Sequence, residues 1–185
     1  MNNNTSSGSQ SATNQATPPA IQYILVTLAD HRYGVRLDTL QEVLRYSQLA
    51  VAPMLNSPEW LDGITSLRGT ILSVVNLRAF LGLPRQTEPT KSGSPATSSR
   101  RGVARMLVVA NPELTVGIVV DDLEGVLSVQ PKQVKTPSAY RGDPALPYLD
   151  GVHIDLENKR KVALLNLQRL VASPQMLRFE PAYTL

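Results

Sequence analysis

An internal repeat constrains the fold of this chain of 185 residues more than any other feature. Residues 33–44 align with residues 116–127, and residues 60–64 align with residues 148–152 in the same order. Five identical pairs share one offset of 83: Gly34/Gly117, Asp38/Asp121, Leu40/Leu123, Val43/Val126 and Leu44/Leu127. Two ordered matches are hard to attribute to chance, so the sequence predicts two copies of one small unit.

Short apolar segments separated by turn residues indicate that each unit is mainly β. Glycine and proline total 25 residues and aromatic residues make up only 5%, which favours short elements and tight turns over a helical bundle. One helical turn is expected at 77–81, ended by Gly82. The predicted strands cover residues 21–28, 33–37, 49–52, 64–67 and 70–75.

A second short helix is predicted after Thr39. Thr39 and Glu42 have the spacing of a capping box, in which each side chain bonds the backbone at the other's position. Leu40, Val43 and Leu44 would then lie on one apolar face of that helix.

The predicted fold class is mainly β, with two tandem, closely packed β-barrels and short helices. About five strands per unit are too few to leave the edges bare, so each unit should curl into a barrel. Barrels of about 65 to 80 residues are marginal alone and should pack together about a pseudo-twofold axis. The barrels are expected at roughly 33–84 and 104–165 of a domain over 21–172, and strand exchange between them is left open.

Three polar or proline-bearing segments flank or interrupt this domain. Residues 1–20 and 85–102 are rich in Ser, Thr, Asn and Gln, and they are expected to form a disordered tail and a mobile loop. Residues 173–185 are expected to form a C-terminal tail. No signal peptide and no apolar run of membrane-spanning length occur, so a cytoplasmic protein without membrane insertion is expected.

Catalytic and metal-binding side chains are scarce. The chain has no cysteine and only two histidines, His31 and His153, which excludes thiolate chemistry and a histidine-rich metal site. The neighbouring Asp121 and Asp122 could suggest paired carboxylates, but Asp121 repeats Asp38, and both precede an apolar pattern that favours helix capping. The sequence therefore predicts no catalytic residue, no metal site, no cofactor and no enzyme activity.

The net charge of +3 raises the alternative of a small nucleic-acid-binding barrel. The basic residues crowd two polar segments, 85–105 and 159–161, without interleaved aromatic residues on which bases could stack. Solvated loops explain this charge better, and no nucleic-acid partner is predicted.

Several strings of residues, in order and spacing, resemble the CheW family from about residue 21 to residue 171. Single strings are weak signals, but their joint order is specific. They are found at 33–35, 41–43, 60–64, 67–69, 75–78, 116–121, 125–127, 148–151 and 164–167.

The resemblance implies two SH3-like barrels and an adaptor function in a bacterial chemosensory array. Its expected partners are the cytoplasmic tip of a methyl-accepting chemoreceptor and the regulatory domain of a CheA-type histidine kinase. The protein would be recruited to membrane receptor arrays without inserting. The resemblance also implies a receptor-binding groove between the barrels, which carried over to this sequence comprises Leu40, Glu42, Val43, Gly63, Arg68, Gly117, Leu123 and Val126.

Each kind of groove residue also has a simpler explanation that involves no partner. The four aliphatic side chains could be ordinary core, and Glu42 could be explained by its capping role alone. Arg68 could be a solvated charge in a tight turn or a guanidinium that pairs with a partner. Gly63 and Gly117 are expected to act by permitting close approach of the backbone.

Departures from the family pattern occur at Ser66, where the family usually has Asn, and at Asn76, where it usually has Asp. Together with the long 85–102 loop, they raise the alternative of a CheW-like module of a pilus-linked or other non-flagellar system. A fragment of a larger regulator is a further alternative, less favoured by the start at Met1.

Overall fold

The computed structural model describes residues 18–83, 104–112, 114–137, 142–155 and 160–178. The predicted 85–102 loop lies outside these ranges, as do most of the predicted N-terminal tail and residues 179–185 of the C-terminal tail.

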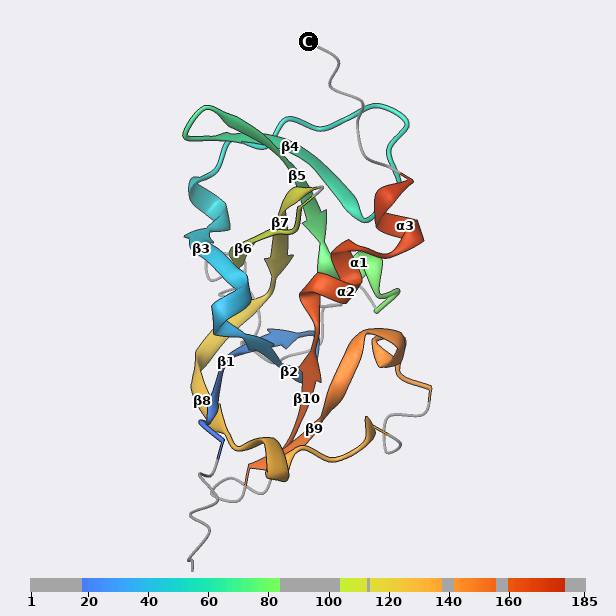
Figure 1. Cartoon of the computed structure of the whole chain (residues 1–185). Helices are drawn as coiled ribbons and strands as arrows, with labels where there is room; N and C mark the ends of the chain where they lie inside the picture. The colour runs from blue at the N-terminus through green and yellow to red at the C-terminus, as the bar shows by residue number, and fades with distance from the viewer. Residues whose placement is uncertain (1–17, 84–103, 113, 138–141, 156–159, 179–185) are drawn as a thin grey trace, which may run out of the picture.

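The described residues form a mainly β structure with few and short helices (Figure 1). The helices are α1 (Leu77–Phe80), α2 (Leu167–Val171) and α3 (Pro174–Leu177). The strands are β1 (Ile21–Leu28), β2 (His31–Arg36), β3 (Leu40–Arg45), β4 (Leu61–Leu67), β5 (Thr70–Asn76), β6 (Arg105–Ala110), β7 (Thr115–Val120), β8 (Asp122–Val129), β9 (Leu149–Asp155) and β10 (Arg160–Leu165). Two 3₁₀ turns flank the strand β3: η1 (Leu37–Thr39) precedes it and η2 (Tyr46–Gln48) follows it.

The strands form two five-stranded sheets, which confirms the mainly β prediction. Sheet A has the order β8-β1-β2-β10-β9, and sheet B has the order β3-β6-β7-β5-β4. The sequence repeat maps β1 to β5 and α1 onto β6 to β10 and α2, and it converts one strand order into the other. Each sheet therefore combines the first two strands of one repeat with the last three of the other. The antiparallel pairs β1·β8 and β3·β6 and the parallel pairs β2·β10 and β5·β7 join the two contributions.

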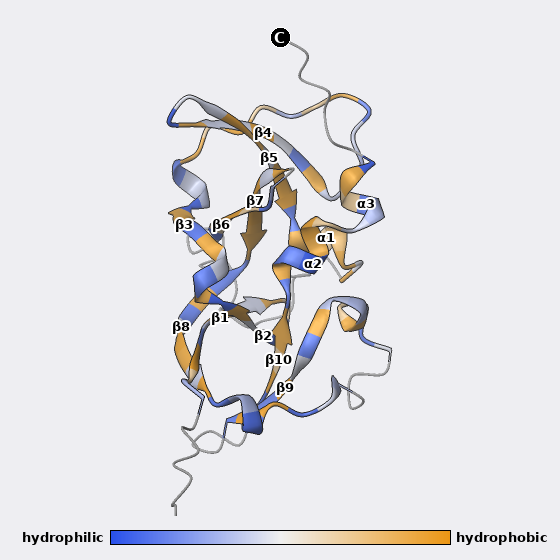
Figure 2. Ribbon diagram, viewed as in Figure 1, coloured by the Kyte–Doolittle hydropathy of each residue, from blue (hydrophilic) through white to orange (hydrophobic). Residues whose placement is uncertain are grey.

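Three apolar clusters hold the sheets together. The largest, which we call the central core, lies between the sheets and includes Val26 and Val35 of sheet A, Val109 and Ile118 of sheet B, and Leu77 of α1. A smaller cluster lies on the opposite face of each sheet, inside its curl. Figure 2 shows the apolar residues along β7 and β10, whose neighbours on both sides are other strands. Since the central core draws on both sheets, neither sheet can bury its apolar face alone.

The predicted helix after Thr39 is wrong, because this segment is the strand β3. Only η1 is helical, and the Thr39 hydroxyl donates to the Arg36 carbonyl instead of capping a helix. The pairing of β3 with β6 shifts register between Leu40 and Glu42. This bulge places Leu40 and Val43 on the same face of the strand, so an irregular strand imitates the spacing of a helix.

The capping interpretation of Asp121 is wrong for the same reason. The residues after it form β8, which pairs with β1 through an equivalent register shift opposite Leu25 and Val26. The expected strand at 49–52 is also absent, and only Ala52 makes an isolated bridge, to Ile64. The helical turn predicted at 77–81 is confirmed as α1, with the Asn76 side chain accepting from Ala79 N.

Gly63 lets the chain after β3 reach the opposite edge of sheet B. Ala52 N donates to the Ile64 carbonyl at 2.8 Å, and Ile64 N donates to the Ala52 carbonyl at 2.9 Å. A Cβ atom at Gly63 would lie 2.1 Å from the Ala52 oxygen, so no other residue fits without breaking this bridge.

We expect Gly63→Ala to lower the free energy of unfolding by roughly 3 kcal/mol, through the steric clash and the backbone strain together. Gly125→Ala is the matched control, because Gly125 has φ 154° against 144° at Gly63 but nothing within 4 Å of its Cβ position. Urea unfolding measures both. Equal losses in the two variants would contradict the role assigned to the Ala52 contact.

A polar network ties the end of β3 to β4. The Tyr46 hydroxyl donates to Asp62 Oδ2 at 3.0 Å, and Asn76 Nδ2 lies 3.5 Å from Asp62 Oδ1. Burial, the Asp62 charge and this hydrogen bond raise the pKa of Tyr46 from its ordinary 10.0 to about 12.

This raised pKa predicts a loss of stability at alkaline pH. Between about pH 10 and about pH 12 the unfolded chain releases the Tyr46 proton while the folded chain retains it, so the free energy of unfolding falls as pH rises. Tyr46→Phe should make this decline shallower. The substitution will not abolish the decline in the free energy of unfolding, since burial also raises the pKa of Tyr23. Urea unfolding at about pH 8 and about pH 11 tests this, and an unchanged decline in Tyr46→Phe would refute it.

Candidate apolar groove and its polar neighbours

The bulges in β3 and β8 direct four of the predicted groove residues toward one side of each sheet. Residues directly opposite in a ladder share a face. Leu40 and Val43 lie opposite Val109 and Leu107, which belong to the central core. Leu123 and Val126 lie opposite Val26 and Ile24, which belong to the same core. The four aliphatic residues therefore border the seam between the sheets, along the edge strands β3 and β8 (Figure 1).

These four side chains divide into a partly buried and an exposed pair. Leu40 and Leu123 are half-buried and pack against the central core. Val43 is 37% exposed and Val126 is 57% exposed. A role in the apolar core thus accounts in part for the aliphatic side chains of Leu40 and Leu123. It does not account for the exposed side chains of Val43 and Val126.

Leu37 directly precedes this apolar border in the chain and was missed by the sequence reasoning. It lies in η1 directly before β3 and is 40% exposed. Its counterpart in the repeat is Val120, which is 1% exposed. Both residues are apolar, so the sequence does not distinguish them. Leu37 is exposed and Val120 is buried because the chain follows a different path at the two crossovers. We call Leu37, Leu40, Val43, Leu123 and Val126 the seam stripe.

Glu42 lies on the face of β3 opposite to that of Leu40 and Val43, and Arg68 in the β4–β5 turn reaches it there. Glu42 is opposite Val108, inside the curl of sheet B, and it accepts from the Arg68 guanidinium at 2.9 Å. Arg68 and Gly69 have φ 51° and 84°, the left-handed pair expected of a tight hairpin turn, which confirms the predicted turn. The Arg68 side chain is 78% exposed and that of Glu42 is 24% exposed. The structure thus brings the two polar residues together, but apart from the seam stripe.

This ion pair borders a hollow of roughly 250 Å³ at the end of sheet B. Its lining residues are Gln41, Glu42, Leu67, Arg68, Thr70, Leu72, Val108 and Thr115. Because the two charges already pair with each other, a partner would have to satisfy both or displace one of them.

Gly63 and Gly117 offer space instead of a binding surface. A Cβ atom at Gly117 would lie 2.3 Å from the Met106 sulfur, as one at Gly63 would lie against the Ala52 carbonyl. Close approach is therefore what both glycines permit, to backbone at Gly63 and to a side chain at Gly117.

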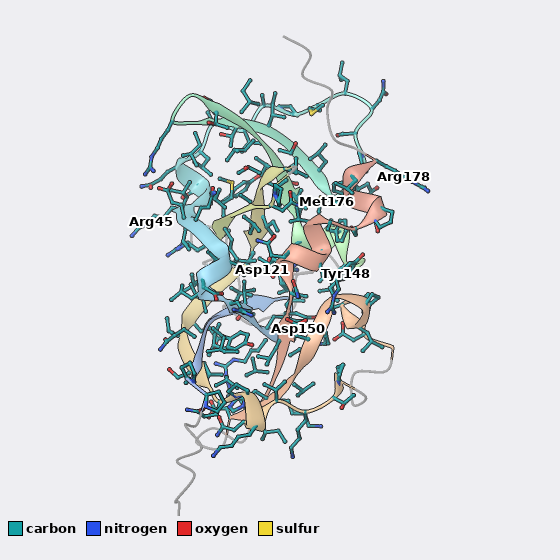
Figure 3. All side chains as sticks on the ribbon, viewed as in Figure 1. Arg45, Asp121, Tyr148, Asp150, Met176 and Arg178 are labelled. Atoms are coloured by element: carbon teal, nitrogen blue, oxygen red, sulfur yellow. The ribbon has the colours of Figure 1, made fainter. Side chains whose placement is uncertain are left out.

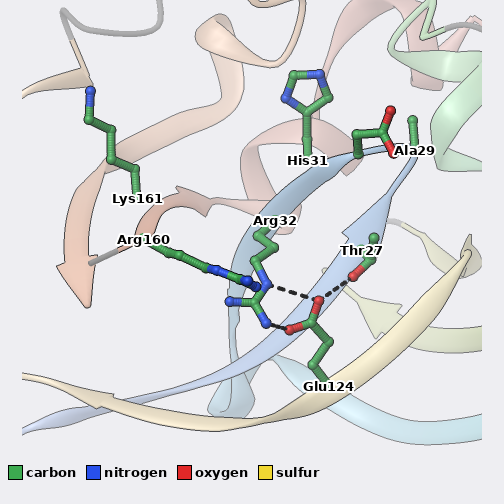
Figure 4. Close-up of a pocket in the computed structure, with 8 residues that line it drawn as sticks. Thr27, Ala29, His31, Arg32, Glu124, Arg160 and Lys161 are labelled. Carbon is green, nitrogen blue, oxygen red and sulfur yellow. Dashed lines mark hydrogen bonds and ion pairs between the residues drawn. The ribbon is translucent and has the colours of Figure 1, made fainter. Parts of the chain in front are cut away.

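A second hollow, of roughly 450 Å³, occupies the equivalent position at the end of sheet A (Figure 4). Glu124 lies at its wall and accepts from the Thr27 hydroxyl at 2.7 Å and from Arg32 Nε at 2.9 Å. Arg160 and Lys161 also line it. Glu124 and Arg160 correspond in the repeat to Gln41 and Thr70 of the first hollow, so the two ends share geometry but not charge.

No group of three or more His, Cys, Asp or Glu side chains that could hold a metal occurs in the part of the chain that the structure describes. None of the described helices is long and apolar enough to cross a membrane.

A profile described as the CheW-like domain matches residues 22–175. The chain belongs to the CheW-like family. The family resemblance drawn from the sequence motifs is thereby confirmed, and with it the assignment to a family of chemotaxis scaffold proteins.

Two curated relatives and one solved structure are similar to this chain. The chain is 26% identical over 160 residues to the chemotaxis protein CheW of Klebsiella aerogenes, covering 84% of each chain. It is 27% identical over 153 residues to the protein FrzA of Myxococcus xanthus, covering 83% of this chain and 86% of that one. The crystal structure of the scaffolding protein TtCheW from Thermoanaerobacter tengcongensis has the same fold, with a TM-score of 0.66 at 19% identity over 85% of this chain and 95% of that one.

Proposed function

We propose that this CheW-like protein is a non-enzymatic adaptor that couples chemoreceptors to a CheA-type histidine kinase in a bacterial signalling array. The seam stripe is the observation that carries the proposal. An apolar border between two packed sheets suits the apolar face of an amphipathic helix, which is the form of a chemoreceptor tip. In this proposal the protein acts in the cytoplasm and is recruited to membrane receptors through that contact.

We further propose that each sheet with its connections forms an SH3-like barrel within the 21–172 domain. Two equivalent bridges support this reading. Ala52 pairs with Ile64 beyond β3, and Lys135 pairs with Val152 beyond β8. Each bridge links one edge of a sheet to its other edge and so favours a curled shape.

The departure at Asn76 gives little support to a non-flagellar system. Asn76 caps α1 through Ala79 N and lies within 3.5 Å of Asp62. Asn166 does the same at α2, through Arg169 N and Asp150. Both repeats place an asparagine beside an aspartate, so helix capping is a local structural reason for asparagine at position 76. The proposal of a pilus-linked or other non-flagellar role therefore rests on Ser66 and the 85–102 loop.

The nucleic-acid alternative predicts salt-sensitive binding to single strands. Most of the basic residues that raised it lie outside the described residues. The basic residues Arg32, Arg160 and Lys161 share the second hollow with Asp30 and Glu124, so the two carboxylates offset part of the positive charge that would attract phosphate. A mobility shift with single-stranded DNA at low salt would favour this alternative.

We expect Val126→Arg to weaken binding of a chemoreceptor signalling-tip helix by more than about tenfold, because it places a charge in an apolar contact. Ile71→Arg is the matched control, since Ile71 is 52% exposed against 57% for Val126 but lies on β5, away from the seam. Isothermal titration measures both. Equal affinities for the two variants would remove the seam stripe from the receptor site.

Arg68→Ala and Leu123→Arg separate the two parts of the predicted groove. Capture of the receptor tip and of CheA by each variant is compared with the original protein in a pull-down. Leu123→Arg should reduce receptor capture, because Leu123 borders the seam. If Arg68 also contacts the receptor, Arg68→Ala reduces it too. Undiminished capture by both variants would overturn the groove assignment.

A further inference from the structure

An ion pair joins the two sheets where the chain crosses from β7 of sheet B to β8 of sheet A. The Arg78 guanidinium donates to Asp121 Oδ2, and the same oxygen accepts from Ala29 N at 2.7 Å. Asp121 N in turn donates to the Thr27 carbonyl at 3.1 Å. Arg78 belongs to α1, which follows sheet B, whereas Ala29 lies in the turn between β1 and β2 of sheet A. Figure 3 labels Asp121 near the middle of the molecule.

The arginine of this pair is buried and the aspartate is partly buried. The Arg78 side chain is only 9% exposed and that of Asp121 is 25% exposed. In such surroundings a broken pair leaves an uncompensated charge, so the arrangement tolerates little movement. We call Arg78, Asp121 and Ala29 the crossover clamp.

Among the described residues, the equivalent crossover from β2 to β3 shows no such clamp. Asp38 occupies the place of Asp121 in the repeat but pairs with Arg36, with side chains 61% and 41% exposed. Gln168 occupies the place of Arg78 and donates to the Ala110 carbonyl at 2.8 Å. Exposed pairs contribute little rigidity. The same backbone plan therefore has a largely buried ion pair at one crossover and an exposed ion pair at the other.

The two crossovers lead into the two strands that carry the seam stripe. Asp121 directly precedes β8 with Leu123 and Val126, whereas η1, with the exposed Leu37, precedes β3 with Leu40 and Val43. We propose that Arg78 is a positioning residue: the crossover clamp holds β8 as the fixed wall of the groove, and the β3 wall adjusts when a helix binds. This inference rests on the proposed function only for the nature of the helix.

The first test needs no partner. In the full-length protein, Arg78→Gln should speed hydrogen exchange of the Ala29 amide and of β8 by roughly tenfold or more, with little change in β3. Arg36→Gln, which breaks the equivalent exposed pair, is the control and should leave β8 unchanged. The double variant Arg78→Gln with Asp121→Asn removes both charges, so it reports on the clamp even if the single variant fails to fold.

The second test measures binding of a receptor signalling-tip helix to the same variants. Arg78→Gln should weaken binding by roughly tenfold, Arg36→Gln by less than about twofold, and Arg78→Lys should recover part of the loss. A helix bound by the original protein and equally well by Arg78→Gln overturns the positioning role. If the original protein binds no such helix, the proposed function fails, and unchanged exchange in β8 would overturn the clamp independently.

Discussion

The exchange of strands between the repeats is the constraint on which the rest of this structure depends. Each sheet takes two strands from one repeat and three from the other. The contributions are held together by the antiparallel pairs β1·β8 and β3·β6 and by the parallel pairs β2·β10 and β5·β7. Neither repeat can then fold as a complete sheet alone. The central core, which includes residues of both sheets and of α1 and α2, is the consequence, and it fixes where the seam between the sheets must run.

The seam in turn decides which side chains are available to a partner. β3 and β8 are edge strands, and their bulges place Val43 and Val126 on the face that borders the seam, where both side chains stay exposed. In a regular strand, residues three positions apart lie on opposite faces, so Val43 would be separated from Leu40, and Val126 from Leu123. The candidate binding surface is thus a by-product of the crossover geometry, in agreement with family members being scaffolds built on one fold.

Twofold repetition in the backbone coexists with asymmetry in the side chains. The two hollows correspond in position, yet Glu124 and Arg160 stand where the other has Gln41 and Thr70. The two crossovers correspond too, yet one holds a largely buried ion pair and the other an exposed one. Duplicated folds can diverge in this way because the apolar core maintains most of the shared architecture, which leaves many polar positions free to specialise.

The sequence alone determined the duplication, the mainly β composition, the hairpin turn at Arg68 and Gly69, and the family. These depend on local chemistry and on residue order, which are legible without coordinates. The tertiary structure decided that Leu40 and Val43 lie on a strand, that Glu42 faces away from them, and that Leu37 is exposed while Val120 is buried. The physical reason is that a bulge shifts side chains by one position, and a shift of one residue in a strand exchanges its two faces. Similarly, the sequence favoured a helix cap for Asp121 and could not predict its ion pair, because its partners Arg78 and Ala29 are brought to it by the crossing of the chain between sheets.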